Sequence, residues 1–146
     1  MRKSIMFSKT CQYAIRAVLY LAAHTSIEAK IRVEDLSNVL NAPQHFLAKI
    51  LQQLVRSHLI SSIKGPNGGF YLTDANKAGN LAQIVECIDG PDVFKSCILG
   101  LPQCSSDHPC PLHFQSFTFR EGIHFHLRNQ TIGKIAQQLE NEEIKI

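Results

Sequence analysis

A glycine-rich turn sets the strongest limit on the fold of this chain. Residues 64–68 read Lys-Gly-Pro-Asn-Gly and lie between two β-prone runs, residues 59–63 and 69–73. Glycine and asparagine tolerate the positive φ angles that tight hairpin turns require. The pattern therefore predicts one β-hairpin in a chain whose other apolar residues recur mainly at helical spacing.

Three amphipathic helices are predicted ahead of this hairpin. The first follows Ser8 as its N-cap and runs to about residue 23, and the second covers residues 33–40 with Val39 on its inner side. Pro43 suits the first position of the third helix. The apolar residues of the third helix recur at i, i+3, i+4 and i+7: Leu47, Ile50, Leu51 and Leu54. Three helices followed by a hairpin form a winged helix-turn-helix, which we assign to residues 1–76.

The second part of the chain is predicted to place a loop between helices. A helix capped by Asn80 precedes a loop over residues 92–110, and a long helix then extends from Pro111 to about Asn129. Thr131 is expected to cap a last short helix. The fold class is thus mainly α with a small β-hairpin.

The long helix is apolar on two sides. One side carries Leu112, Phe119, Ile123 and Leu127, and the other carries Phe114, Phe117 and Phe125. A late helix of this kind typically packs one side on its own chain and the other on a partner. We therefore expect residues 77–146 to contain a long C-terminal dimerisation helix and to form one compact chain with residues 1–76.

Charge is distributed unevenly along the chain. Residues 1–75 contain nine Lys and Arg against four Asp and Glu, whereas residues 76–146 contain six against eight. The 45% hydrophobic and 18% charged content excludes an intrinsically disordered chain. A basic first half is typical of a partner for nucleic acid.

The N-terminus predicts a cytoplasmic protein without membrane contact. Its first nine residues are basic but do not lead into the apolar run of a secretory signal. The most apolar stretch, residues 13–23, is interrupted by Arg16 and is too short to span a bilayer.

The third helix and the turn carry the candidate DNA-binding residues. Gln44, His45 and Lys49 occupy the N-terminal part of a polar helix face, where side chains can reach base edges in the major groove. At the turn, Lys64 and Asn67 suit the minor groove or a phosphate. Ser8 and Lys9, at the start of the first helix, suit phosphate. The alternative is that the polar face is merely solvated.

Three cysteines in the predicted loop form the candidate metal site. Cys97, Cys104 and Cys110 are separated by six and five residues, whereas zinc sites typically pair ligands two to four residues apart. Thiolates on a longer loop favour an iron–sulfur cluster. For a fourth ligand we expect His113, with His108 as the second choice. Three incidental buried thiols are the alternative.

The remaining residues offer little support for an enzyme. Cys11 and Cys87 lie on apolar helix faces and are expected to be small core side chains. No Ser-His-Asp arrangement, phosphate-binding glycine loop or paired carboxylates rise above chance.

Five segments and the three cysteines form one recognisable pattern: residues 8–16, 46–54, 63–72, 110–113 and 131–136. Together they resemble the bacterial IscR/NsrR-type winged-helix regulators, over nearly the whole chain. The segment Ile-Lys-Gly-Pro-Asn-Gly-Gly-Phe-Tyr-Leu at residues 63–72 is the most specific of them and resembles the family's wing.

The resemblance implies a homodimer that binds a palindromic DNA operator and carries an iron–sulfur cluster, [2Fe–2S] ahead of [4Fe–4S]. The cluster ligands carry over to Cys97, Cys104 and Cys110, and the histidine ligand of one branch carries over to His113. Another branch takes a carboxylate from the partner's first helix, but the matching residue here is Gln12. A recognition-helix glutamate of some relatives corresponds to Ala48. The gap between the first two cysteines is six residues, where five is usual.

The sequence thus predicts a transcriptional repressor that senses iron–sulfur, redox or nitric oxide status through its cluster. One alternative is a regulator without a cluster, controlled by thiol oxidation or zinc. Another is a small iron–sulfur interaction protein that does not bind DNA.

Overall fold

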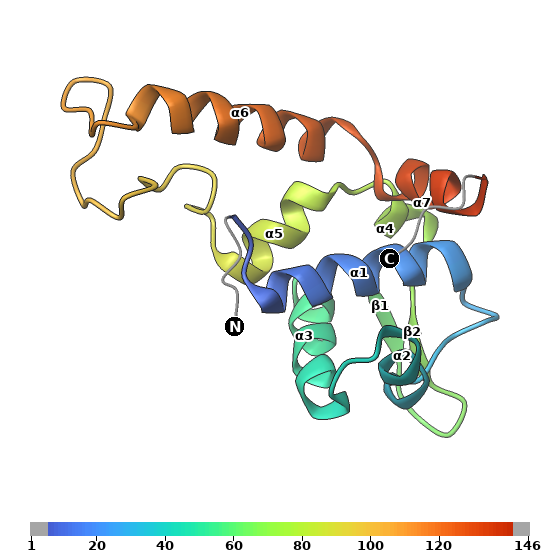
Figure 1. Cartoon of the computed structure of the whole chain (residues 1–146). Coiled ribbons are helices and arrows are strands. Elements are labelled where there is room, and N and C mark those ends of the chain that lie inside the picture. The colour runs from blue at the N-terminus through green and yellow to red at the C-terminus, as the bar shows by residue number, and fades with distance from the viewer. Residues whose placement is uncertain (1–5, 142–146) are drawn as a thin grey trace.

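The computed structural model describes residues 6–141 and is mainly helical with one antiparallel hairpin (Figure 1). Arg2 and Lys3, which contribute to the basic first half, lie outside the described residues. The first part of the chain contains α1 (Lys9–His24), α2 (Val33–Leu40), α3 (Gln44–Arg56), β1 (Ser61–Ile63) and β2 (Gly69–Tyr71). The second part contains α4 (Asp74–Lys77), α5 (Leu81–Asp89), α6 (His113–Asn129) and α7 (Ile132–Asn141). The predicted fold class is confirmed, and only the single-turn α4 was not expected.

Three predicted helix caps are confirmed, whereas Pro43 is the N-cap of α3 rather than its first residue and α6 begins at His113 rather than at Pro111. The Ser8 side chain accepts a hydrogen bond from the Cys11 backbone N–H at 3.0 Å. Asn80 forms a capping box with Gln83, and the Thr131 hydroxyl accepts from the Lys134 backbone N–H at 3.1 Å. Each cap satisfies a backbone donor that a helix N-terminus leaves unpaired, so these helices begin where their sequence indicates.

The hairpin turn depends on its glycines. Gly65 has a φ of +111°, and a Cβ atom at Gly68 would collide with the carbonyl oxygen of Ile63. The strands pair Ser61 with Tyr71 and are shorter than predicted. Two hydrogen bonds between Ile31 and Phe70 attach the segment before α2 to the hairpin, a long-range contact that the sequence did not indicate.

One core joins the parts before and after residue 76. Helix α1 packs against α2, α3, α5 and α7, and the main core includes Leu47 and Leu54 from α3, Ile84 from α5 and Ile132 from α7. The four apolar residues predicted to face inward from α3 are all buried. Val39 was predicted to face inward, but 51% of it is exposed because α2 turns only Leu36 and Leu40 into the core. The domain division at residue 76 stays a prediction.

Helix α6 packs on its own chain differently from the prediction. It runs along α5, with Ile123 and Leu127 against the smaller core, which contains Cys11 and Phe94. Phe119 and Leu112, predicted on this side, are 55% and 44% exposed. Ser116 and Arg120 are buried instead, because the side of α6 that faces the chain contains polar as well as apolar positions.

Among residues 6–141, no helix is both long and apolar enough to cross a membrane.

The buried face of α3 predicts a large stability effect. Leu47 is fully buried, so Leu47→Ala should lower the free energy of unfolding by about 2–5 kcal/mol, through lost apolar burial and an unfilled cavity. Chemical denaturation at one fixed protein concentration measures this. Val39→Ala is the matched control and should change the free energy of unfolding by less than about 0.5 kcal/mol. Equal effects of the two substitutions would contradict the packing described here.

Candidate nucleic-acid interface and cysteine site

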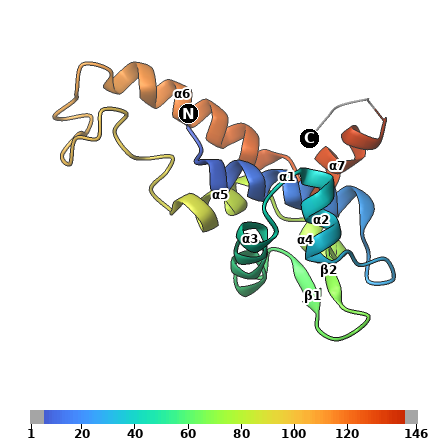
Figure 2. The ribbon, with the colours of Figure 1, turned by 60° about the horizontal axis from the view of Figure 1, so that its bottom comes forward.

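Helix α3 and the hairpin project from the same side of α1, and α6 lies on the opposite side (Figures 1 and 2). Because α3 turns its apolar residues into the core, its polar residues face outward, and Gln44, His45 and Lys49 are exposed. Lys64 and Asn67 are exposed at the hairpin turn. The predicted base-reading and wing residues therefore share one side of the molecule, while their contact with DNA stays a prediction.

Two basic residues line a cleft between α3 and the hairpin. Its volume is about 480 Å³, and its walls include Arg56 from α3, Lys64 from the turn, and the apolar side chains of Val55, Ile63 and Phe70. Arg56 was not among the predicted DNA-binding residues. Its position in the last turn of a helix with a polar face was the available signal.

Arg32 holds the tip of the hairpin. Its guanidinium donates to the backbone carbonyl of Pro66, at the centre of the turn. No motif marked Arg32 in the sequence, because its role arises from a contact across 34 residues. The turn that carries Lys64 and Asn67 is thus attached to the segment preceding α2.

Ser8 is exposed and also contacts Asp89, the last residue of α5. Its backbone N–H donates to Asp89 at 2.9 Å, and its hydroxyl donates to the same carboxylate. A carboxylate therefore already lies at the N-terminus of α1, where negative charge is favoured. Lys9 is exposed, with its Nζ atom 5.9 Å from the centre of the Tyr13 ring. Phosphate binding by Ser8 and Lys9 stays a prediction.

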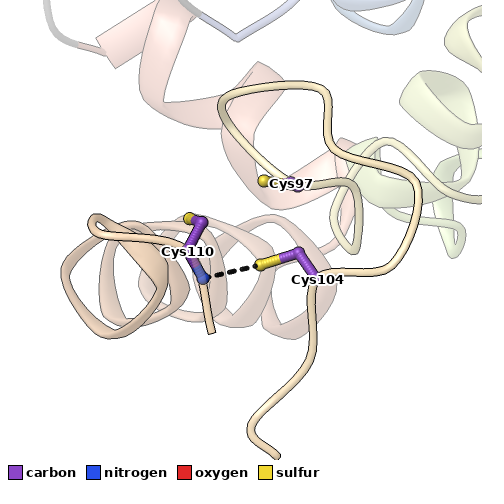
Figure 3. Close-up of side chains that lie close together, drawn as sticks. All are labelled: Cys97, Cys104 and Cys110. Atoms are coloured by element: carbon purple, nitrogen blue, oxygen red, sulfur yellow. Dashed lines mark hydrogen bonds between the residues drawn. The ribbon is translucent and has the colours of Figure 1, made fainter. Parts of the chain in front are cut away.

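Three thiols come together where the loop before α6 folds back on itself (Figure 3). The Sγ atoms of Cys97, Cys104 and Cys110 all lie within 4.8 Å of one another. Cys110 is buried, and the other two are half-buried. The backbone N–H of Cys110 donates to Cys104 Sγ at 3.4 Å, which stabilises negative charge on that sulfur.

His113 is the histidine that lies beside these thiols. Its Nδ1 atom is 3.1 Å from Cys104 Sγ, and its backbone N–H donates to the carbonyl of Cys110 at 3.1 Å. As the first residue of α6, it is held close to Cys110 by the start of the helix. Its ring also stacks on Phe117, with 6.2 Å between centroids. His108, the second choice, is exposed on the loop.

The thiols differ in how readily they ionise. Hydrogen bonding from the backbone of Leu101 lowers the pKa of Cys97 to about 7, so a large part of it is thiolate at neutral pH. Burial raises the pKa of Cys110. Burial, with the nearby Asp89 carboxylate, raises the pKa of Cys11 to about 12. The thiolate is the ligand form of cysteine, so Cys97 is ready to bind a metal whereas Cys11 is not.

Cys11 and Cys87 have the structural roles predicted for them. Cys11 is completely buried in the smaller core. Cys87 packs against the main core, and its thiol contacts the Ser57 hydroxyl at 3.3 Å.

The donor set at the triad suits a metal ion or an iron–sulfur cluster. Three sulfur atoms that can each supply a thiolate converge on one place, and an imidazole nitrogen lies beside them. Thiolate and imidazole are the ligands preferred by zinc and by iron–sulfur clusters.

Comparison with known proteins places the chain in a family. Residues 7–138 match the family Rrf2, described as "Iron-dependent Transcriptional regulator". The chain belongs to the Rrf2 family. It is 30% identical over 130 residues to an HTH-type transcriptional regulator of Aquifex aeolicus, covering 88% of this chain and 89% of that protein. It is 27% identical over 135 residues to the HTH-type transcriptional regulator IscR of Erwinia tasmaniensis, and the match covers 92% of this chain and 79% of that protein.

Solved structures confirm the winged helix-turn-helix fold of this Rrf2 protein. CymR, the global cysteine regulator of B. subtilis, superposes with a TM-score of 0.71 at 20% identity, and the match covers 94% of this chain and 98% of CymR. IscR of T. potens superposes with a TM-score of 0.72 at 16% identity, and the match covers 95% of this chain and 91% of that IscR. The Rrf2 family consists of transcriptional regulators, not enzymes, and its helix-turn-helix implies DNA binding.

The contact of Arg32 with the turn predicts a role in DNA affinity. Arg32→Met should weaken DNA binding about fivefold, because the loss of one hydrogen bond of about 1 kcal/mol frees the wing. The salt dependence should stay unchanged, since Arg32 binds the turn and not a phosphate.

Fluorescence anisotropy across a salt series measures both quantities. Lys30→Met is the matched control, because Lys30 donates to Ile27 within its own loop. A flatter salt slope for Arg32→Met would show that Arg32 contacts DNA directly.

Proposed function

We propose that this chain is a homodimeric transcriptional repressor that acts in the cytoplasm on a palindromic operator, and that an iron–sulfur cluster on Cys97, Cys104, Cys110 and His113 sets its DNA affinity. The convergence of three Sγ atoms within 4.8 Å carries this proposal, with His113 Nδ1 3.1 Å from Cys104. We favour [2Fe–2S] because mixed cysteine and histidine ligation is established for that cluster type. Such a cluster, when bound, supplies chemistry that responds to iron supply, oxidants and nitric oxide.

The exposed phenyl rings of α6 support a dimer. Phe114, Phe117, Phe119 and Phe125 are each between 49% and 59% exposed, so about half of each side chain lies in water, although Phe114 and Phe117 also contact His113. Monomeric proteins rarely leave an apolar group of this size in water. A second copy of α6 is the occupant that we propose, since a symmetric dimer presents two recognition helices to one palindromic site.

The DNA contacts that we propose lie on α3 and the wing. Gln44 and His45 would read base edges with Lys49, and Lys64 and Asn67 would contact the minor groove or backbone. Lys64→Ala and Lys49→Ala should each weaken binding, and loss of a phosphate contact should reduce the salt slope by about 0.9.

Asp89 provides a route from the cysteine loop to the DNA-binding helices. It is the last residue of α5, and the loop with the three cysteines starts directly after it. Its carboxylate binds the start of α1 through Ser8, and α1 packs on α3. A change in the loop on gaining or losing its bound group would therefore shift α1, and linkage then requires different DNA affinities for the two states.

The compactness of the triad also favours a second candidate, a zinc-controlled regulator. Around one tetrahedral zinc, with Zn–S bonds of about 2.3 Å, sulfur atoms lie about 3.8 Å apart. A cluster distributes its thiolates over more than one iron atom and so holds some of them farther apart. A separation of at most 4.8 Å is compatible with a single ion.

Anaerobic purification distinguishes the candidates. The visible spectrum is recorded with iron, sulfide and zinc analysis, and the same sample is used to select bound duplexes from a random-sequence DNA library. A coloured protein with equal iron and sulfide that selects a palindrome supports the proposal. A colourless protein with one zinc per chain supports the second candidate. A coloured protein that selects no DNA would contradict the regulatory role and support an iron–sulfur interaction protein.

A further inference from the structure

Arg120 is a buried arginine beside the cysteine site. It lies in the middle of α6, and only 7% of it is exposed. None of the described residues forms an ion pair with it. A buried charge without an opposite charge is strongly unfavourable, so such an arginine requires a physical reason.

Its hydrogen bonds connect α6 to the start of the cysteine loop. The Nη1 atom donates to the carbonyl of Ser96, the residue directly before Cys97, and the Nε atom donates to the carbonyl of Ser116 at 3.3 Å. The guanidinium therefore fixes the backbone next to the first cysteine against the helix that begins with His113.

The cavities around Arg120 reach both parts of the donor set. On one side it lines a cavity of about 550 Å³ together with Ser96 and Cys97. On the other it lines a cavity of about 220 Å³ together with His113. The first cavity also contains the carboxylates of Asp89 and Asp92, but no described carboxylate pairs with Arg120. Asp89 already binds Ser8.

We propose that Arg120 is a positioning residue for the cysteine site, which holds the backbone of Cys97 and supplies positive charge to the three thiolates when they are loaded. This inference rests on the proposed function. Three thiolates that bind a divalent zinc or cobalt ion give the site a net charge of −1. Three thiolates that bind an oxidised [2Fe–2S] unit, which carries a charge of +2, give the same net charge. The Arg120 guanidinium would offset this net negative charge of the loaded site. A site whose three thiols are protonated does not carry that charge.

The spacing of α6 identifies the residue. His113, Ser116 and Arg120 occupy positions i, i+3 and i+7, so they share one face of the helix. This face points to the loop and to α5. Arg120 thus connects the proposed dimer helix to the proposed ligands.

The test compares Arg120→Met and Arg120→Lys with Arg128→Met, which removes an exposed arginine from the same helix. Anaerobic Co²⁺ titration of the full chain, followed by thiolate-to-cobalt absorption, measures affinity without reference to DNA. We expect Arg120→Met to bind Co²⁺ about 10- to 100-fold more weakly than wild type, as for other residues that support ligands. Arg120→Lys should recover part of this loss because it keeps the charge, and Arg128→Met should match wild type.

The reduction potential of the reconstituted cluster gives a second readout. It should become more negative in Arg120→Met and stay near wild type in Arg120→Lys, because a cation stabilises the more negative reduced state. If Arg120→Met does not fold, Arg120→Gln replaces it, since it keeps a donor without the charge.

The inference about Arg120 would be overturned if Arg120→Met bound Co²⁺ as tightly as wild type, or if Arg120→Met and Arg120→Lys lost equal affinity. Either result would leave the proposed metal site standing. A wild-type protein that binds neither Co²⁺ nor a cluster would overturn the proposed metal site and this inference together.

Discussion

A Cys104→Ser variant should lose its bound metal or cluster while keeping its fold. Cys104 is the central member of the site, because it accepts a hydrogen bond from Cys110 and lies 3.1 Å from His113. Residues that only support metal ligands account for about 10- to 100-fold in affinity, so loss of a ligand should exceed about 100-fold. The serine hydroxyl is nearly isosteric but does not ionise at neutral pH, and it therefore cannot replace the thiolate. Anaerobic metal analysis and the visible spectrum measure the loss.

Cys87→Ser is the matched control, since Cys87 is a thiol of the same chain that lies outside the triad. It should retain the full metal content. The thermal midpoint of the Cys104→Ser apo-protein should agree with that of wild-type apo-protein, because Cys104 is half-buried and the triad belongs to a loop rather than to the core. Full metal content in Cys104→Ser would refute the proposed ligand set.

A Phe117→Glu variant should be monomeric and should lose most of its affinity for a palindromic site. Phe117 is 49% exposed on α6, within the set of phenyl rings that we assign to the dimer. Full burial of a Phe side chain contributes about 1.5–3 kcal/mol, so the exposed half of Phe117 contributes about 0.8–1.5 kcal/mol. In a symmetric interface each substitution counts twice, which predicts a dimer weakened by about 1.5–3 kcal/mol from lost apolar burial alone, with the cost of burying the new carboxylate added. The apolar part alone is about tenfold to a hundredfold in the dimer dissociation constant. Sedimentation velocity over a concentration series measures it.

Gln115→Glu provides the control, because Gln115 is exposed on the same helix and receives the same charge without loss of a ring. It should remain dimeric. Because Phe117 also stacks on His113, metal content is measured alongside, and Phe125→Glu repeats the test far from the cysteines. A Phe125→Glu protein that sediments as a dimer would place the interface elsewhere.

Local signals in the sequence were sufficient for much of the fold. Ser8, Asn80 and Thr131 begin helices because a side-chain oxygen satisfies backbone donors only two or three residues away. Gly65 allows the turn because its φ of +111° is available to glycine at little cost. These effects act within a few residues, so they can be read without knowing the tertiary structure.

Burial on α6 could not be read in the same way. Phe119 and Leu112 have the spacing of a core face, yet Ser116 and Arg120 are the residues that turn inward. Hydrophobic spacing reports which residues share a face, but the helix bears apolar residues on two faces. The tertiary structure decides which of these faces contacts α5 and the cysteine loop, because the long loop between α5 and α6 sets the orientation of α6.

The same distinction applies to the functional site. The sequence by itself determined the winged helix-turn-helix and the polar face of α3, and it indicated the three cysteines as a possible metal or cluster site, because these depend on local patterns and on residue chemistry. Only the tertiary structure brought the thiols within 4.8 Å of one another, attached Ser8 to Asp89, and buried Arg120 against Ser96. These contacts join residues that are up to 81 positions apart, and the free energy of packing the whole chain decides them.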